Sequence, residues 1–487
     1  CFSEYKVVPN DGDENDSFGH SISMNADWIA ISANRDEPSG ENSGSVYLYR
    51  LDENIIVEEQ KIFPADGDFN DYFGKSISLY GEWLAISSVY DNDNGNKSGS
   101  VYIYHLSNNY WIEYSKIVPI DGLPYDRFGY CLDIYANTLA VGSVFDDDLG
   151  ENAGSVYIYS LDNDEWVFSQ KIYANINNDD NNFGIKLSIY DDIVAVSSIN
   201  ADVDYLNQGL VDIFSLHSDG IWLYDQTILS LSPNNYDYFG ISIDVYKNII
   251  AVGAYFDDQI NNNSGAVYLY EKISNNWIPI DNITSIDAYA NDNFGLSLSV
   301  YDDWLVVGSI DDDNGINSGS AYIYHKENDE YIEKIKILPS DGSEYDEFSS
   351  SIYLNENNLI VGSKYDDDMG TDSGSAYLFT YKGCTDINAC NNDSYILTDN
   401  NQCIFPQNGF DCYGICYESI DYCEVCGGNG SNGDANVDGS VNVIDITMIV
   451  NYILNDSPIN ICTVDLNQNS IINITDLIIL IENILND

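Results

Sequence analysis

The sequence predicts a mainly β protein, in which a seven-bladed β-propeller is followed by a small Cys-rich segment and a C-terminal α-helical, EF-hand-like domain. Three observations predict this architecture. A Phe-Gly dipeptide recurs at near-constant spacing, each copy begins four short segments rich in Ile, Val, Tyr and Ser, and the composition changes abruptly after Lys382. At 487 residues the chain also exceeds the usual size of a single core, so a repeat architecture or several domains is expected.

The repeat unit begins at Phe-Gly. The dipeptide occurs at Phe18, Phe73, Phe128, Phe183, Phe239 and Phe294, and Phe348 followed by Ser349 adds a seventh copy, with steps of 55, 55, 55, 56, 55 and 54 residues. In one unit FGKSISLY is followed by WLAISS, an acidic loop, SGSVYIY and YWIEYSKIVP. Because turn residues separate these segments, each unit is expected to form four antiparallel strands, a to d.

The two ends of the repeat region predict how the ring closes. The last unit stops after strand c, at SGSAYLFTY, and the N-terminal EYKVVP aligns with the strand d segment EYSKIVP. The first residues are therefore expected to complete the last blade and to hide two sheet edges. Cys1 would precede this strand and Cys384 would follow its partner, so a Cys1–Cys384 disulfide is one interpretation and a lipidated Cys1 is the other.

The units resemble the FG-GAP repeats of secreted bacterial proteins, which are related to the propeller of integrin α-subunits. The resemblance covers residues 1–382 and is carried by copies such as KIFPADGDFNDYFGKSISLYGEWLAISSVYDNDNGNKSGSVYIY. Integrin-type repeats have a calcium loop of the form DxDxDG between strands a and b. This chain has only a short turn there, such as Tyr80-Gly81-Glu82-Trp83, so those calcium sites are not transferred to it.

Acidic loops are expected to gather on one rim of the propeller. Successive strands alternate in direction, which places the b–c and d–a loops on the same side. Clustered carboxylates repel each other unless a cation lies between them, and dense oxygen ligands suit Ca²⁺. The alternative is that Asp, Asn and Gly are only turn formers that keep the protein soluble. The candidate propeller ligands are Asp66, Asp68, Asp71, Asp91, Asp93, Asp121, Asp126, Asp146, Asp148, Asp311, Asp313, Asp341, Asp346, Asp366 and Asp368.

Residues 383–432 are predicted to be a disulfide-bonded linker. Seven of the ten cysteines fall between Cys384 and Cys426, a density typical of proteins in an oxidising compartment. A zinc site is the alternative, but no His lies nearby and the spacing does not give two CxxC pairs. The linker therefore favours a secreted or cell-surface protein.

Residues 433–487 carry the most specific local signal, two EF-hand-like loops that each precede an apolar helical run. Loop one is GDANVDGSVNVID, with ligand positions 1, 3, 5, 7, 9 and 12 at Asp434, Asn436, Asp438, Ser440, Asn442 and Asp445. Loop two is DLNQNSIINITD, with Asp465, Asn467, Asn469, Ile471 through its backbone, Asn473 and Asp476 at the same positions.

Two loop–helix units of this kind, with Asp at position 12, resemble a type I dockerin domain. The resemblance implies tight binding of two Ca²⁺ and docking to a cohesin-like module. The pair at loop positions 10 and 11, which contacts cohesin in the family, is usually polar. In this chain the pair is Val443 and Ile444 in loop one, and Ile474 and Thr475 in loop two.

Charge and motifs restrict the function. The net charge of -63 disfavours nucleic acid and anionic membranes as partners, and no apolar run is long enough for membrane insertion. No nucleophile elbow, HExxH, P-loop or GxGxxG context is found, so an enzyme is not expected.

The sequence favours a secreted calcium-binding adhesion or binding protein. Its propeller face would contact a glycan or a protein, and its tail would dock to a cohesin-like module. A self-assembling subunit of an extracellular filament or surface layer is the alternative, in which the partner is a second copy of the chain. A polysaccharide-degrading hydrolase or lyase is a more distant one.

Overall fold

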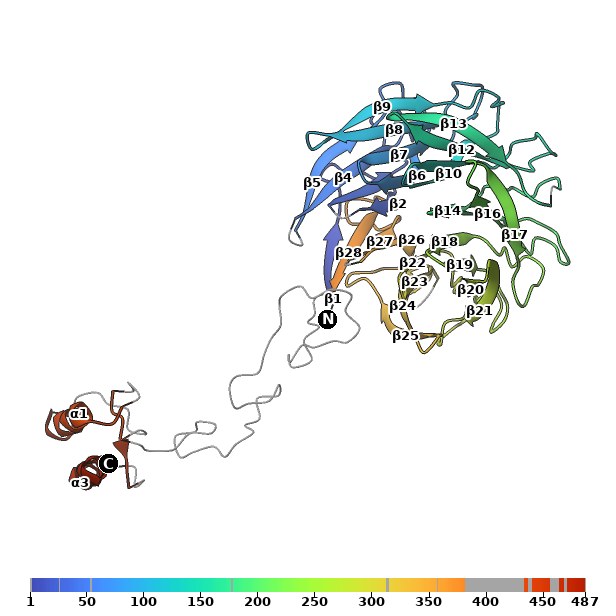
Figure 1. Ribbon diagram of the computed structural model, residues 1–487. Helices are drawn as coiled ribbons and strands as arrows, with labels where there is room; N and C mark the ends of the chain where they lie inside the picture. Colours follow the sequence, from blue (N-terminus) through green and yellow to red (C-terminus); the bar gives the residue numbers. More distant parts are fainter. Residues whose placement is uncertain are drawn as a thin grey trace. The chain divides into compact units, whose positions relative to one another are not determined.

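The computed structural model describes residues 2–25, 27–52, 55–176, 178–311, 315–356, 358–381, 433–436, 440–455, 464–467 and 471–486. The chain divides into two compact units, of which one is Phe2–Tyr381 and the other contains Lys382–Asp487. The first unit is built from seven four-stranded antiparallel sheets, which confirms the seven-bladed β-propeller (Figure 1).

The strands follow the predicted a to d order in every blade. Blade one contains β2 (Phe18–Met24), β3 (Trp28–Ala33), β4 (Ser45–Asp52) and β5 (Ile55–Ile62). Blade two contains β6 (Phe73–Tyr80), β7 (Trp83–Ser88), β8 (Ser100–Ser107) and β9 (Tyr110–Ile117). Blade three contains β10 (Phe128–Tyr135), β11 (Thr138–Ser143), β12 (Ser155–Asp162) and β13 (Glu165–Ile172).

The remaining blades keep the same order. Blade four contains β14 (Leu187–Tyr190), β15 (Ile193–Ser198), β16 (Leu210–Leu216) and β17 (Trp222–Ile228). Blade five contains β18 (Ser242–Tyr246), β19 (Ile249–Ala254), β20 (Ala266–Ile273) and β21 (Asn276–Ile283). Blade six contains β22 (Leu298–Tyr301), β23 (Trp304–Ser309), β24 (Ser320–Glu327) and β25 (Glu330–Ile337). Blade seven contains β26 (Phe348–Leu354), β27 (Asn358–Ser363), β28 (Ser375–Tyr381) and β1 (Phe2–Val7).

The N-terminal strand closes the ring. β1 pairs with β28 in an antiparallel register that runs from Phe2 opposite Tyr381 to Val7 opposite Ala376. Val7 is buried and packs in one cluster with Phe18 of blade one and Ile360 of blade seven. The predicted closure is therefore confirmed, because β1 is the fourth strand of blade seven and joins the two ends of the propeller.

Blade-to-blade packing explains the recurring Phe and Ser-Gly. Phe128 is fully buried, and its backbone N–H donates to the carbonyl of Ser98 in blade two at 2.8 Å. Gly99 has a φ of 83°, and a Cβ placed there would lie 2.0 Å from the carbonyl oxygen of Phe128. Only glycine fits this approach, so the Ser-Gly of one unit and the Phe-Gly of the next form one joint.

A ring of hydrogen bonds joins the innermost strands. The first strands of neighbouring blades contact each other around the axis (Figure 1). The backbone N–H of Leu79 donates to Ser23 Oγ at 2.9 Å, and that of Ile134 donates to Ser78 Oγ at 3.0 Å. An equivalent hydrogen bond joins blades four and three, where the backbone N–H of Ile189 donates to Asp133 Oδ2 at 2.9 Å.

The C-terminal unit contains two described helices, α1 (Val443–Asn455) and α3 (Ile474–Asn486). They contact each other around a small core formed by Ala435, Ile449, Val464, Ile472 and Leu480. Neither helix in the described residues is long and apolar enough to cross a membrane. The helical C-terminal domain is thus as predicted.

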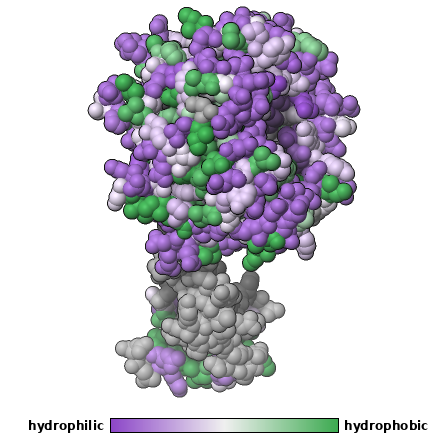
Figure 2. Space-filling model, turned by 90° about the vertical axis from the view of Figure 1, so that its right-hand side faces the viewer, coloured by the Kyte–Doolittle hydropathy of each residue, from purple (hydrophilic) through white to green (hydrophobic). Residues whose placement is uncertain are grey.

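Several predictions fall outside the described residues. The disulfide linker at 383–432, the Cys1–Cys384 disulfide and the ligands Asp313, Asp438 and Asn469 all stay predictions for this reason. In the described part of the chain, Cys131 is a free and buried thiol. The visible propeller surface is largely hydrophilic, and its hydrophobic side chains are scattered in small groups (Figure 2).

Candidate binding sites

The b–c and d–a loops meet on one rim, as the strand directions predict. The backbone N–H of Tyr125, in a d–a loop, donates to the carbonyl of Asn96, in a b–c loop, at 2.8 Å. The N–H of Tyr72 donates to the carbonyl of Asn42 at 3.1 Å in the same arrangement. Each d–a loop is therefore fixed to the b–c loop of the preceding blade, and the acidic side chains of both loop families share this rim.

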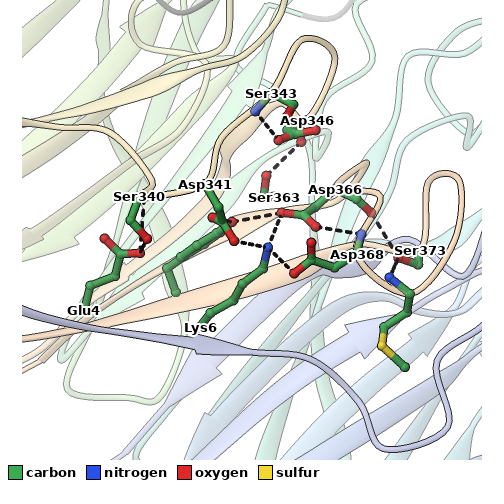
Figure 3. Close-up of polar contacts among 12 residues, drawn as sticks. Glu4, Lys6, Ser340, Asp341, Ser343, Asp346, Ser363, Asp366, Asp368 and Ser373 are labelled. Carbon is green, nitrogen blue, oxygen red and sulfur yellow. Dashed lines mark hydrogen bonds and ion pairs between the residues drawn. The ribbon is translucent and has the colours of Figure 1, made fainter.

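A lysine lies among the carboxylates of blade seven (Figure 3). Lys6 Nζ is 2.8 Å from Asp341 Oδ2, 2.8 Å from Asp366 Oδ2 and 2.5 Å from Asp368 Oδ2. The Tyr377 hydroxyl donates to the Asp341 and Asp366 carboxylates, each at 2.8 Å. The lysine of strand d thus places its ammonium group between the carboxylates of the two acidic loops.

The same network recurs around the ring. In blade two, Lys116 Nζ lies 2.9 Å from Asp66, 2.7 Å from Asp91 and 2.7 Å from Asp93. In blade three, Lys171 Nζ contacts Asp121 at 3.2 Å, Asp146 at 2.6 Å and Asp148 at 2.6 Å. Lys61 pairs with Asp11 and Asp36 in blade one, and Lys336 pairs with Asp287 in blade six.

Blades four and five lack this lysine. In blade four Asp212 takes the place of the tyrosine, and the Thr227 hydroxyl donates to its carboxylate. In blade five Asn282 stands at the lysine position and donates to Gln259 at 2.9 Å, while the Tyr268 hydroxyl donates to Asp257. These two blades therefore replace the lysine ammonium with uncharged hydrogen-bond donors.

Charge pairing shifts the pKa of both partners. Burial lowers the pKa of the Lys116 ammonium, but hydrogen bonds to Asp91, Asp93 and Asp66 outweigh it and the pKa lies well above the usual value. For Asp287, burial raises the pKa, but Lys336, Ser285 and Tyr322 bring it down to about 2. The Lys116 ammonium and the Asp287 carboxylate are therefore held in their charged forms.

In every d–a loop except the one before blade four, an aspartate stands two residues before the repeat Phe, and the hydrogen bonds of Asp71, Asp126 and Asp346 show its role. Asp71 Oδ2 accepts the N–H of Asp68 at 2.7 Å, and Asp126 Oδ2 accepts that of Leu123 at 2.7 Å. Both side chains are buried, and burial is the main reason why the pKa of each carboxyl is raised to about 6. Asp346 does the same for the N–H of Ser343 at 2.6 Å. The fixed spacing of the DGxxxD motif thus has a structural cause, because its last Asp caps the loop.

Calcium on the propeller rim stays a prediction. Within the described residues, no group of three or more His, Cys, Asp or Glu side chains is arranged to hold a metal ion. The one described candidate of blade six, Asp311, accepts the N–H of Asn317 at 2.8 Å. In blades two, three and seven the position between the carboxylates is taken by the lysine ammonium. The sequence offered a signal for this residue, since a lysine recurs in strand d at Lys6, Lys61, Lys116, Lys171 and Lys336.

The C-terminal loops orient their last aspartate by backbone hydrogen bonds. Asp445 is fully buried, and its carboxylate accepts the N–H groups of Ala435 at 2.9 Å and Asn442 at 2.8 Å. Asp476 occupies the same place in loop two and accepts the N–H of Asn467 at 3.2 Å and of Asn473 at 3.0 Å. Each loop is therefore folded around the carboxylate at position 12.

The donor set fits calcium. Asp434, Asp445, Asp465 and Asp476 are all buried, and they lie at positions 1 and 12 of the two loops. Asn467 Oδ1, at position 3 of loop two, is buried with no hydrogen-bond partner among the described residues. Buried carboxylates and an unpartnered amide oxygen are hard oxygen ligands, which is the chemistry that Ca²⁺ takes. The chemistry of these side chains fits Ca²⁺, and the individual ligands of the two loops stay predictions.

The pair at loop positions 10 and 11 lies at the first turn of each helix and stays exposed. Val443 and Ile444, where α1 begins, are 67% and 57% exposed, and Ile474, where α3 begins, is 65% exposed. Exposed aliphatic side chains at matching positions of two helices form a surface suited to a protein partner.

Comparison with known proteins identifies both parts of the chain. The FG-GAP repeat family matches residues 2–49, 56–104, 111–159, 222–270, 277–324 and 331–379, and the dockerin type I domain family matches residues 432–485. The search of curated proteins found no match. Among solved structures, the chain is similar to the WD40 domain from Toxoplasma gondii coronin, with 9% identity, a TM-score of 0.46 and coverage of 83% of this chain and 89% of that one.

The six FG-GAP matches leave out residues 160–221, which include most of blade four. This blade is the one that replaces the core tyrosine with Asp212 and the strand lysine with Thr227. The matched segments cover more than half of the chain and agree with the repeat boundaries that the strands define. The chain therefore belongs to the FG-GAP repeat family and carries a type I dockerin domain over residues 432–485.

Proposed function

We propose that this chain is an extracellular binding protein, in which the propeller rim contacts a ligand and the dockerin domain docks to a cohesin-like module in the presence of Ca²⁺. The observation that carries the proposal is the pairing of a rigid propeller with a type I dockerin domain. Dockerin-containing proteins are typically extracellular or on the cell surface. The propeller would thus be displayed wherever a cohesin partner is anchored.

Calcium supplies the charge that lets the loop carboxylates lie together. Asp434 and Asp445 in loop one, and Asp465, Asn467 and Asp476 in loop two, are the buried donors among the described ligand residues, which also include Asn436, Ser440, Asn442 and Asn473. Because position 12 of each loop falls in the first turn of α1 or α3, ordering the loops also fixes where these helices begin. Docking is therefore expected to require Ca²⁺.

The exposed aliphatic pair supports a partner that offers an apolar surface. Val443, Ile444 and Ile474 would bury their side chains on docking, whereas polar residues at these positions would hydrogen-bond. We therefore expect the cohesin-like partner of this chain to present apolar side chains where it contacts Val443, Ile444 and Ile474.

Binding, rather than catalysis, is the role we propose for the propeller. The four histidines lie in four different blades. Burial raises the pKa of the Cys131 thiol to about 12, so this group is a poor nucleophile at neutral pH. Neither residue type therefore supports an acid–base or nucleophilic centre in the described propeller.

The test is calorimetric titration of the full chain with type I cohesin modules, with and without a calcium chelator. We expect calcium-dependent binding that Ile444→Asp and Ile474→Asp weaken, while Leu485→Asp, which changes another exposed helix residue, leaves it unchanged. Calcium-dependent polymerisation of the chain without any cohesin would instead favour the structural subunit. Binding that persists in chelator would overturn the proposed mode of docking.

A further inference from the structure

Basic side chains gather at the axis of this strongly acidic propeller. Lys75 Nζ lies 3.4 Å from His20 Nε2, across the boundary between blades two and one. His20 and Lys75 belong to the innermost strands β2 and β6, which contact each other. Lys186 immediately precedes the innermost strand β14, and Lys364 immediately follows β27, which contacts β2. Burial first, and then Lys75, Lys364, Lys186 and Arg35, lower the pKa of His20, which agrees with this placement. The axial cationic cluster consists of His20, Arg35, Lys75, Arg127, Lys186 and Lys364, which come from blades one, two, three, four and seven.

The axial cationic cluster concentrates basic side chains that are rare in this chain. It contains five of the 17 Lys and Arg side chains, against 80 acidic residues in the whole sequence. In the part of the chain that the structure describes, no ion pair joins Lys75 or Lys186 to a carboxylate, and Lys364 pairs with Glu347 at 2.7 Å. The strand d lysines on the outer part of the rim, such as Lys116, are paired with aspartates, whereas Lys364–Glu347 is the one ion pair of the axial cluster among the described residues.

Burial, together with neighbouring cations, lowers the pKa of the Lys75 ammonium. Burial first, and then Lys186, Lys364, Arg35 and Arg127, lower the pKa of the Lys75 ammonium to about 8. An anion placed among these groups would reverse the shift, because it would favour the charged form of each lysine. Lys186 is exposed, and His20 and Lys75 are partly exposed, so a small anion can reach them from solvent.

Aromatic rings surround the cations. Arg127 lies over the rings of Tyr90 at 5.0 Å and Phe145 at 4.4 Å, and Lys75 lies over Tyr130 at 5.5 Å. Lys364 lies 4.9 Å from the centroid of Tyr365. On the blade five side, Tyr255 and Phe256 stack at 3.9 Å next to Tyr238. All of these rings are partly exposed, and a partly exposed aromatic face beside a charged group can contact a sugar ring that carries an acid group.

The net charge of the protein does not prevent such binding. At physiological ionic strength, charges separated by more than about 8 Å are largely screened. Strand d lysines partly offset the charge of the nearest acidic loops in blades one, two, three, six and seven. The electrostatic interaction of a small anionic group at the axis is therefore mainly with the axial cationic cluster. A long polyanion would also be repelled by the acidic outer surface.

We propose that the axial cationic cluster binds an anionic saccharide, whose carboxylate or sulfate group is held by Lys75, Lys186 and Lys364 while the sugar ring lies on the neighbouring aromatic side chains. This deepens the proposed function, because it names the ligand class of the propeller and rests on its role as a binding module. The dockerin domain takes no part in it.

The experiment is calorimetric titration of the full chain, at low ionic strength and pH 7, with four probes: inorganic sulfate, a trigalacturonate, a sulfated trisaccharide and a neutral trisaccharide. We expect the two acidic saccharides to bind and the neutral one to bind at least about tenfold more weakly, because the neutral saccharide lacks the charge-assisted hydrogen bonds to the lysines. Lys75→Met and Lys186→Met should each weaken binding by about tenfold. Lys247→Met, which removes an exposed lysine paired with Asp302 at 2.7 Å, is the matched control and should change nothing.

A pH series gives a second readout. The groups that face Lys75 are His20, Arg35, Arg127, Lys186, Lys364 and the Tyr130 ring, with Glu347 beside Lys364. Because Lys75 loses its proton near pH 8, affinity should fall between pH 7 and pH 9, and Lys75→Met should flatten this dependence.

The outcomes separate this proposal from the proposed function. Equal affinity for the neutral trisaccharide, or unchanged affinity in the lysine variants, would overturn the anionic site and leave a propeller ligand of another kind. Sulfate that binds as tightly as the acidic saccharides would show an adventitious ion only and would overturn the saccharide. Failure of cohesin docking with intact saccharide binding would overturn the docking and leave this site standing. Melting temperatures of the variants confirm that each has folded.

Discussion

Lys116 Nζ lies 2.7 Å from Asp91 Oδ2, although the lysine belongs to the last strand of its blade and the aspartate to the loop between the second and third. The same ammonium reaches Asp66 and Asp93, and the Tyr102 hydroxyl donates to Asp66 at 2.8 Å. Blades three and seven repeat the arrangement with Lys171 and Lys6. The propeller thus carries its own cation at the positions where the sequence predicted a metal.

Lys116→Met should destabilise the propeller by about 3 kcal/mol, because it leaves the buried Asp91 carboxylate without its partner. Thermal or urea unfolding in chelator measures the loss. Addition of Ca²⁺ should restore part of it, since three carboxylates then surround a vacant cation position. Lys247→Met is the control and should be neutral, as its ion pair is exposed. A variant as stable as the parent protein would contradict a structural role for the ion pair.

Stability of the propeller should rise as the pH falls from about 7 to about 4. The buried loop-capping aspartates have a raised pKa in the folded state, about 7 for Asp16 and Asp237 and about 6 for Asp71, Asp126 and Asp346, with burial as the main cause. A carboxyl whose folded pKa exceeds its unfolded value of about 3.9 contributes stability below that value, and the contribution is lost as the pH rises through the folded pKa. Denaturant unfolding at several pH values measures it.

Asp71→Asn should remove part of this pH dependence. Blade four offers the natural precedent, because Asn181 stands at this position and donates to the Ile176 carbonyl at 2.7 Å. The amide keeps an oxygen for the Asp68 N–H but does not titrate. An unchanged pH profile in this variant would contradict the assignment of the shift to the loop-capping aspartates.

Asp445→Ala should abolish one calcium site and Asp476→Ala the other. Each carboxylate is fully buried and holds two or three backbone N–H groups of its loop, so its loss removes both a ligand and the loop conformation. Calorimetry should give two bound Ca²⁺ for the parent and one for each variant. Calcium titration that leaves the circular dichroism of the chain unchanged would argue against coupling between the ions and the helices.

Val7→Asp should open the propeller. Val7 is 6% exposed and packs where β1 joins blade seven to blade one, so a carboxylate there would be buried without a partner, at a cost of about 3 kcal/mol. Tyr5→Asp is the matched control on the same strand, because Tyr5 is 39% exposed. Hydrogen exchange of β28 and thermal unfolding measure the effect, and equal stability of the two variants would contradict closure by this strand.

Much of the fold was readable from the sequence. The spacing of Phe18, Phe73 and Phe128 is set by the length of one blade, and the glycine of the Ser-Gly pair, such as Gly99, is required by a backbone approach that no side chain allows. The EF-hand-like loops were readable for a similar reason, because ligand positions such as Asp445 and Asp476 follow from local chain geometry. Both features depend on residues close together in the chain.

Contacts between distant residues were not readable in this way. Lys6 and Asp341 are separated by almost the whole ring, and only closure of the propeller brings them to 2.8 Å. Counting acids along the sequence therefore predicted a cation at the rim without revealing which one the structure supplies.

The sequence by itself determined the number of blades, the strand that closes the ring and the two C-terminal loops, since repeat length, strand alternation and ligand spacing are local properties. Tertiary structure decided which charges meet. His20 and Lys75 directly follow the Phe-Gly of their repeats, but Lys186 and Lys364 stand at other repeat positions on other blades, and the four converge because the strands and loops nearest the axis surround one channel. Electrostatic interactions depend on distance in space, which the order of residues in the chain does not give.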